Sequence, residues 1–128
     1  MYKIKLSTKE RNTMINITSD VQNAVREIKL SDGIVTVYCP HTTAGITINE
    51  SADPDVRADI LKKLEDLIPY NGQYEHSEGN SDAHIKSTLV GNSVQIFVEK
   101  GELQLGTWQA IYFCEFDGPR NREVWVKD

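Results

Sequence analysis

Short apolar segments alternate with polar ones along this chain in a spacing typical of antiparallel strands. Residues 2–7 and 13–18 have strand character, and the polar residues 8–12 between them predict a hairpin. The apolar run from Ile34 to Cys39 predicts a buried strand, and residues 46–48 resume the extended pattern. In the last third of the chain, residues 85–89, 94–99, 108–116 and 123–127 predict four more strands, separated by turns that contain Gly, Asn or Asp.

Two segments have the period of an α-helix instead. Ser19 and Gln22 have the spacing of a capping box, and the apolar positions that follow on one face are Val21, Ala24, Val25 and Ile28. Asp53 followed by Pro54 predicts the N-cap and first residue of a second helix, which ends at Pro69. Residues 69–83 show no pattern, and loops of that length in small domains are usually functional or disordered.

Strands that outnumber helices predict an α+β fold: a mainly antiparallel β-sandwich with two helices packed on one side. The strand order does not follow from the pattern. At 128 residues, 39% of them hydrophobic and 26% charged, the chain has the size and composition of one globular domain over residues 1–128. The net charge is −5 and the basic residues form no stripe, so we expect no nucleic-acid partner.

Neither a membrane span nor a secretion signal is predicted. No apolar run approaches the ~20 residues that a transmembrane helix needs, and residues 1–6 alternate polar and apolar instead of forming the apolar core of a signal peptide. Cys39 and Cys114 are far apart and lie within strand patterns, where they are expected to behave as small hydrophobic residues. We therefore expect a cytoplasmic protein without a membrane partner.

All three histidines, His41, His76 and His84, lie in polar segments that predict loops or loop edges. Each one alone also fits an ordinary surface or core histidine. Together they predict a shared site, because three neutral imidazoles suit a divalent metal that is zinc-like rather than magnesium. Their spacing matches no known metal motif, so the metal site and the ordinary interpretation both stay open.

Acidic residues follow the first histidine. Asp53 and Asp55 are explained by the start of the predicted helix, where a cap and the helix dipole favour carboxylates. Glu50 has no such explanation. Glu50 and His41 are therefore our candidate catalytic residues, with Glu50 as a general base or an extra metal ligand.

Residues that could bind a phosphate lie in two turns. Arg120 and Arg122 flank the turn at residues 117–121, and an arginine there could hold a phosphate or carboxylate through paired hydrogen bonds. Thr42 and Thr43 could offer hydroxyls and backbone N–H groups to the same anion. A solvated turn or an intersubunit ion pair would explain the arginines equally well, and hydroxyl-to-backbone bonds would explain the threonines.

Four segments taken together resemble the YjbQ-like family, whose members are described as uncharacterised proteins and as secondary thiamine-phosphate synthase enzymes. The resemblance covers essentially the whole chain. The segments, in order, are Cys39-Pro40-His41-Thr42-Thr43-Ala44-Gly45-Ile46-Thr47-Ile48-Asn49-Glu50, Asn80 with Ala83-His84, Gly101-Glu102-Leu103-Gln104-Leu105-Gly106-Thr107-Trp108-Gln109, and Asp117-Gly118-Pro119-Arg120-Asn121-Arg122.

This resemblance implies a β-sandwich-like α+β subunit, a homotrimer, and a pocket around the three histidines, with Glu50 and Arg120 at other motif positions. It also implies weak thiamine-phosphate synthase activity, which joins a hydroxymethylpyrimidine diphosphate to a hydroxyethylthiazole phosphate. Such a transferase expels pyrophosphate and usually uses magnesium, which prefers oxygen ligands to imidazole. We therefore expect this activity to be a promiscuous one.

Two functions remain in competition. The first is a small-molecule enzyme that acts on a phosphorylated substrate at a histidine-centred metal or phosphate site, and the second is a trimeric protein that binds a metabolite or metal without turnover. A cupin-like metal barrel is disfavoured, because the chain has no His-x-His pair.

Overall fold

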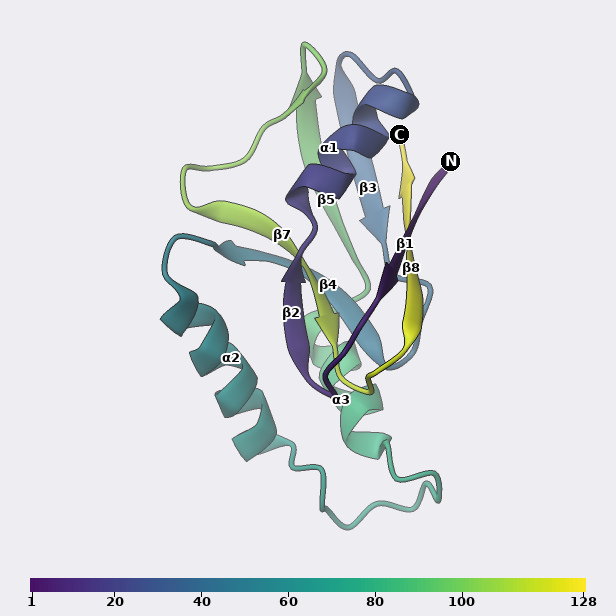
Figure 1. Ribbon diagram of the computed structural model, residues 1–128, viewed down its shortest axis with the longest axis vertical. Helices are drawn as coiled ribbons and strands as arrows, with labels where there is room; N and C mark the ends of the chain where they lie inside the picture. Colours follow the sequence, from purple (N-terminus) through teal and green to yellow (C-terminus); the bar gives the residue numbers. More distant parts are fainter.

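The computed structural model describes residues 1–128 and contains two antiparallel sheets that curl into a half-barrel, with three helices around them (Figure 1). The strands are β1 (Tyr2–Ser7), β2 (Thr13–Asn16), β3 (Gly33–Tyr38), β4 (Ala44–Glu50), β5 (Ser93–Glu99), β6 (Glu102–Leu103), β7 (Gln109–Glu115) and β8 (Asn121–Lys127). The helices are α1 (Thr18–Glu27), α2 (Pro54–Leu67) and α3 (Ser81–Val90). The larger sheet has the order β1-β8-β3-β5-β6, and the smaller one β2-β7-β4. The predicted α+β class is confirmed.

The main core lies between the two sheets and consists largely of β-branched residues. In the larger sheet, alternate residues of β3 and β8 point inward, and Val35, Val37, Val124 and Val126 are all fully buried. In the smaller sheet, Phe113 fills the facing side. Such inward alternation is what a sheet with one solvated face requires. The two cysteines, Cys39 and Cys114, are buried and unbridged as predicted.

Helix α1 packs its apolar stripe into this core, but its start differs from the prediction. The helix begins at Thr18, whose N–H donates to the Asn16 side chain. The side chain of Gln22 does not cap the helix; it bonds to the backbone of Gly101 and Leu103 beside β6. The predicted capping box is therefore wrong, because the Gln22 side chain bonds to residues distant in sequence and not to the start of its own helix. Helix α2 starts as predicted, with Asp53 accepting from the Asp55 N–H and Pro54 in the first turn.

Residues 2–18 do not form a hairpin, contrary to the prediction. β1 pairs with β8, with Tyr2 opposite Val126, whereas β2 pairs with β7 in the other sheet. Residues 8–12 thus cross from one sheet to the other. Local alternation allows either pairing, and burial against strands at the far end of the chain decides between them.

The largest error of prediction concerns residues 81–90, which form helix α3 instead of a loop followed by a strand. This helix buries Asp82, Ala83 and Lys86, while Ile85 and Leu89 are exposed. It therefore has no apolar stripe from which its period could be recognised. His84 consequently lies on a helix, and the number of helices is three rather than two.

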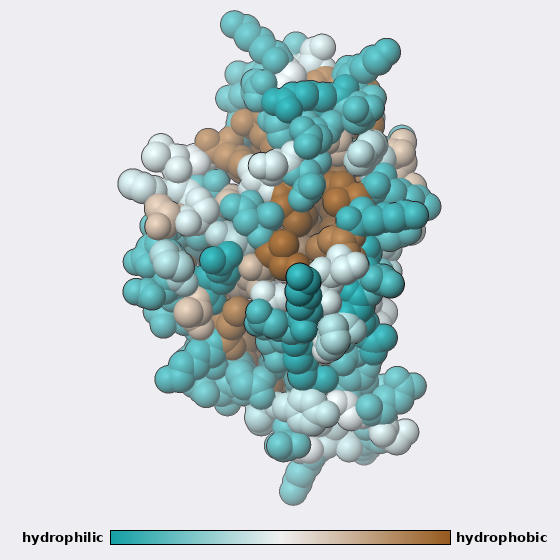
Figure 2. All heavy atoms as spheres, in the orientation of Figure 1, coloured by the Kyte–Doolittle hydropathy of each residue, from teal (hydrophilic) through white to brown (hydrophobic).

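The view in Figure 2 is largely hydrophilic, with an apolar area near its centre, in the space bounded by α1, β1 and β2. None of the three helices has the length and apolar character that a membrane crossing requires.

Candidate functional site

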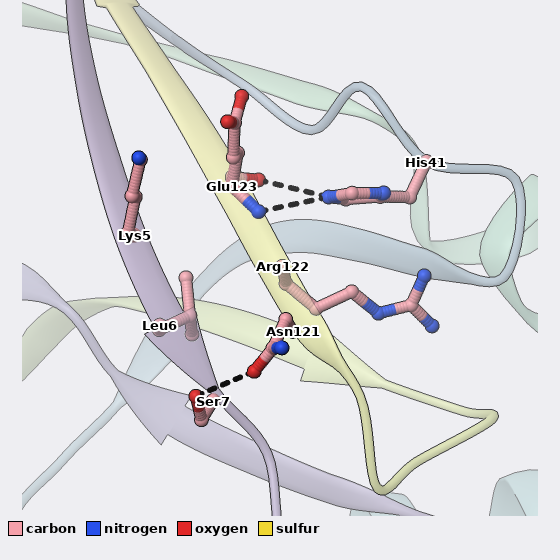
Figure 3. Close-up of a pocket in the computed structure, with 7 residues that line it drawn as sticks. All are labelled: Lys5, Leu6, Ser7, His41, Asn121, Arg122 and Glu123. Atoms are coloured by element: carbon pink, nitrogen blue, oxygen red, sulfur yellow. Dashed lines mark hydrogen bonds between the residues drawn. The ribbon is translucent and has the colours of Figure 1, made fainter.

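His41 occupies an unusual position beside strand β8. The chain leaves β3 at Tyr38 and places the His41 ring beside β8, where Nε2 lies 2.9 Å from the backbone nitrogen of Glu123 and 3.2 Å from its carbonyl oxygen (Figure 3). The N–H donates to an unprotonated Nε2, whereas the carbonyl accepts from a protonated one, so either tautomer of the neutral ring bonds to Glu123. Burial and then the charge of Arg122 lower the pKa of His41 below its ordinary value. His41 is thus a neutral imidazole whose Nε2 is engaged by the backbone in both tautomers, which leaves Nδ1 for a ligand.

Three hollows adjoin this imidazole. The largest, about 640 Å³, lies on the β1–β8 side and is lined by Lys5, Leu6, Ser7, His41, Asn121, Arg122 and Glu123 (Figure 3). A second, of about 540 Å³, lies against helix α3 and is lined by His41, Thr42, Ala44, His84, Ser87, Thr88, Gly91 and Asn92. The third, which we call the Arg120 hollow, has about 350 Å³ and is lined by Pro40, His41, Thr42, Thr43, Glu78, Asn80, His84, Asp117, Arg120 and Arg122.

A buried ion pair supports the floor of the Arg120 hollow. The guanidinium of Arg122 donates to Glu115 from Nε over 2.8 Å and from Nη2 over 2.5 Å, and also to the Thr43 hydroxyl over 2.8 Å. Burial alone would raise the pKa of Glu115, but hydrogen bonds from Arg122, the Asp117 N–H and Thr8 lower it below its ordinary value. Arg122 is therefore a structural cation, since its charge is matched within the protein.

Arg120 is the guanidinium that remains accessible. Its Nε donates to the carbonyl of Asp117 and its Nη2 to the carboxylate of the same residue, both over 2.9 Å, while its side chain stays 52% exposed. The Asp117 carboxylate also accepts from Arg11 and Asn80. Burial would raise the pKa of Asp117, but these donors lower it. The guanidinium is thus held in one orientation, with its other Nη free for a ligand.

The turn that carries Arg120 packs tightly on residues 8–12. At Gly118 a Cβ atom would lie 2.0 Å from the carbonyl oxygen of Glu10, so only glycine permits this approach. Arg11 of the same segment bonds to both Asp117 and Asp82, and its guanidinium stacks 4.0 Å from the Tyr70 ring.

A further buried cation lies behind these groups. Lys86 is 1% exposed and donates to Asp82 over 3.2 Å and to Glu65 over 2.5 Å. With the pairs above, four cations and four carboxylates form matched ion pairs around and beneath the hollow: Arg11, Lys86, Arg120 and Arg122 with Glu65, Asp82, Glu115 and Asp117.

The three histidines are brought near one another in pairs and not as one set. The rings of His76 and His84 are 5.5 Å apart between centroids, and His84 shares two hollows with His41. No group of three or more His, Cys, Asp or Glu side chains is placed to hold a metal ion, and Nε2 of His41 is occupied by Glu123. Within one chain, a three-histidine metal site does not fit this geometry.

The other predicted residues are divided between this site and the rest of the molecule. Glu50 lies at the far end of β4, opposite Gln109, whereas Ala44 beside the histidine loop is opposite Glu115. At ~3.3 Å per residue the two ends of this strand are about 20 Å apart, so Glu50 does not reach His41 within the chain. Its role as a base stays a prediction.

Thr42 and Thr43 do line the hollow with Arg120, but as parts of its frame. The Thr43 hydroxyl accepts from Arg122, and the Thr42 carbonyl accepts from Ser87 on α3. The Thr43 hydroxyl is thus engaged by a side chain and not by the backbone, as the alternative had it, and the phosphate-binding role of both threonines stays a prediction.

Sequence reasoning missed most of the polar frame. Arg11, Asp82 and Lys86 carry no motif, and they lie in segments interpreted as a turn, an unpatterned stretch and a strand, respectively. Asn80 and Asp117 belong to the resembled motifs but were given no role. Charged residues at helical spacing, such as Asp82 and Lys86, were the available signal, but a surface ion pair has the same spacing.

Comparisons with known proteins agree with the resemblance seen in the sequence. The model of the family described as UPF0047 protein YjbQ-like matches residues 2–127. A UPF0047 protein from Methanocaldococcus jannaschii is 54% identical, covering 99% of this chain and 92% of its own, and YugU from Bacillus subtilis is 50% identical, covering 97% and 95%.

Solved structures share the fold. An uncharacterised protein of the YjbQ/UPF0047 family from Clostridium acetobutylicum superposes with a TM-score of 0.96 at 57% identity, over 99% of this chain and 98% of that one. A protein of unknown function from Sulfolobus solfataricus has a TM-score of 0.92 at 31% identity, over 98% and 92%.

Proposed function

The chain belongs to the UPF0047 protein YjbQ-like family, and we propose that its Arg120 hollow binds a phosphate-bearing small molecule. The observation that carries this proposal is the guanidinium of Arg120, which Asp117 orients by two hydrogen bonds while half of the side chain faces solvent. An arginine fixed in this way presents a donor to a phosphate oxygen at little further entropic cost. The imidazoles of His41 and His84 line the same hollow.

We further propose that the bound molecule is a substrate of the thiamine-phosphate synthase type of reaction, as the resemblance implies. Both partners of that reaction carry phosphate groups, so each offers an anion that Arg120 can hold. The matched ion pairs leave little surplus positive charge to stabilise a departing pyrophosphate. This supports a weak, promiscuous activity rather than a dedicated one.

The experiment compares wild-type protein with Arg120→Ala, using hydroxymethylpyrimidine diphosphate and hydroxyethylthiazole phosphate. Product formation is followed together with the affinity for each substrate by calorimetry. Loss of a hydrogen bond to a charged group predicts affinity about tenfold weaker, or more, for Arg120→Ala. Arg26→Ala is the matched control, since Arg26 on α1 is 59% exposed and lies in none of the three hollows.

The outcomes separate the two functions. Binding with product formation supports the enzyme, and binding without product supports the alternative, a metabolite-binding protein without turnover. Equal affinity of Arg120→Ala and wild type for both substrates would show that this hollow is not the phosphate site.

A divalent metal, zinc-like rather than magnesium, remains a separate proposal. The support is the neighbouring pair His76 and His84, two imidazoles that could hold such an ion if solvent or substrate supplied the other ligands. Zinc content after incubation and dialysis should fall in both His76→Ala and His84→Ala but not in His41→Ala. A zinc content of His84→Ala equal to that of wild type would contradict the proposed metal site.

A further inference from the structure

The Arg120 hollow is nearly balanced in charge. The titratable side chains that line it are His41, Glu78, His84, Asp117, Arg120 and Arg122. Arg120 is paired with Asp117, Arg122 is paired with the buried Glu115, and Nε2 of His41 is engaged by the backbone of Glu123. Glu78 adds an exposed carboxylate at the rim, 3.6 Å from His76. A doubly charged anion would therefore meet no surplus positive charge, which favours a ligand with less negative charge.

One polar atom of a residue that lines this hollow lacks a partner. Asn80 is only 8% exposed, and its Nδ2 donates to Asp117 over 3.0 Å. That bond fixes which way the carboxamide points, because the reverse orientation would set two oxygens against each other. The Oδ1 of Asn80 is then buried without a donor. An unsatisfied buried acceptor is costly, so a ligand that brings an O–H or N–H to this wall gains more than one that brings only acceptors.

These two observations are independent and point to the same class of ligand. We propose that the Arg120 hollow selects an oxyanion that still carries a hydrogen-bond donor, such as a monoprotonated phosphate monoester, over a fully deprotonated tetrahedral anion such as sulfate. The inference rests on the proposed function and specifies its substrate class. Arg120 holds the charged oxygens of the ligand, and Asn80 Oδ1 accepts its O–H.

The test uses methyl phosphate and sulfate as probes, titrated calorimetrically into the wild-type protein at pH 6 and at pH 8. The second pKa of a phosphate monoester is about 6, so methyl phosphate carries a proton in about half of its molecules at pH 6 and in few at pH 8. Sulfate carries none at either pH. Because a change in the charge of the protein would affect both anions, the ratio of the two affinities isolates the proton on the ligand.

At pH 6 we expect methyl phosphate to bind about tenfold more tightly than sulfate, or better, the effect of one hydrogen bond to a charged group. At pH 8 this preference should be lost. Asn80→Ala should lose it at pH 6 as well, while Asn23→Ala, on the exposed side of α1, should keep it. If Asn80→Ala does not fold, the ratio of the two affinities in the wild-type protein, compared between pH 6 and pH 8, still tests the proposal.

Each contrary result has its own meaning. At pH 6 the proposal predicts the effect of a full hydrogen bond. If the affinities for the two anions at this pH differed by less than about a factor of three, the selectivity would be overturned, but the phosphate site would stand. A preference that persists unchanged at pH 8 would also overturn it, since the donor is then absent. If neither anion bound, both this inference and the proposed function would fail.

Discussion

Among single residues, His41 shows how a backbone contact determines the chemistry of a side chain. The backbone of Glu123 engages Nε2 through its N–H and its carbonyl oxygen, so this nitrogen is not free to act as a base. The sequence identified His41 as a site residue and assigned it a catalytic role, but this contact depends on a strand more than 80 positions away. The neutral ring is thereby fixed in orientation, and Nδ1 is the nitrogen left for a ligand.

We predict that His41 titrates below its ordinary pKa of 6.5 in the folded protein, because burial and Arg122 disfavour the charged ring. The folded state then binds the proton less tightly than the unfolded chain does. His41 therefore destabilises the fold progressively as pH falls through 6.5, and has no such effect above it. NMR titration of the ring protons measures the pKa directly.

A variant separates this effect from those of other groups. In His41→Gln the amide oxygen can still accept from Glu123 but does not titrate, so the fall in unfolding free energy between pH 7 and pH 5 should be smaller than in wild type. The carboxylates with lowered pKa values act at lower pH, below 4.5 for Glu65, Glu115 and Glu123 and below 3.8 for Asp117. A His41 pKa at or above 6.5 would contradict the prediction.

Among the elements, α3 has the least ordinary packing. Its buried positions are Asp82, Ala83 and Lys86, and the ion pairs of this helix reach α2 and residues 8–12. The exposed Ile85 and Leu89 gave the segment the alternation of a strand. The period of apolar residues predicts a helix only when apolar residues face the core, and here charged residues do so.

We predict that Lys86→Ala destabilises the protein far more than Leu89→Ala does. Removal of Lys86 leaves the buried Asp82 with Arg11 as its remaining cation, and breaking a buried ion pair costs about 3 kcal/mol. Leu89 is 64% exposed, so its truncation should change the free energy of unfolding by only about 0.5 kcal/mol or less. Urea denaturation of the two variants and wild type measures both. A larger effect for Leu89→Ala would mean that apolar contacts, and not the ion pairs, hold α3 in place.

For the whole molecule, the sequence predicted the fold class but not how its parts are paired. Strands such as β3 and β8 have β-branched inward residues and were recognised from local pattern alone. The separation of β1 and β2 into different sheets was missed, because it depends on partners at the opposite end of the chain. The site follows the same rule: motif residues such as His41 and Arg120 were found, while Arg11, Lys86 and the unpaired oxygen of Asn80 became evident only from their contacts.

One face of the molecule remains apolar and uncovered. On the outer side of the larger sheet, Ile34 is 47% exposed and its cross-strand partner Phe97 is 66% exposed. On the same side, the rings of Tyr38 and Trp125 lie 5.7 Å apart. We call these four residues the outer apolar face. Exposed groups of this kind often mark contacts between subunits.

We propose that the chain forms a homotrimer, as the family resemblance implies, and that the outer apolar face contributes to its contacts. Light scattering at micromolar concentration should give three times the mass of one chain. A charge placed at Phe97 would be buried unpaired in such a contact, so Phe97→Arg should lower the mass to that of one chain. Trp108→Arg is the matched control, because Trp108 is 61% exposed and lies outside this face. Wild-type protein with the mass of one chain would contradict the trimer. A trimer that survives Phe97→Arg but is lost in Trp108→Arg would place the contact at the start of β7 instead.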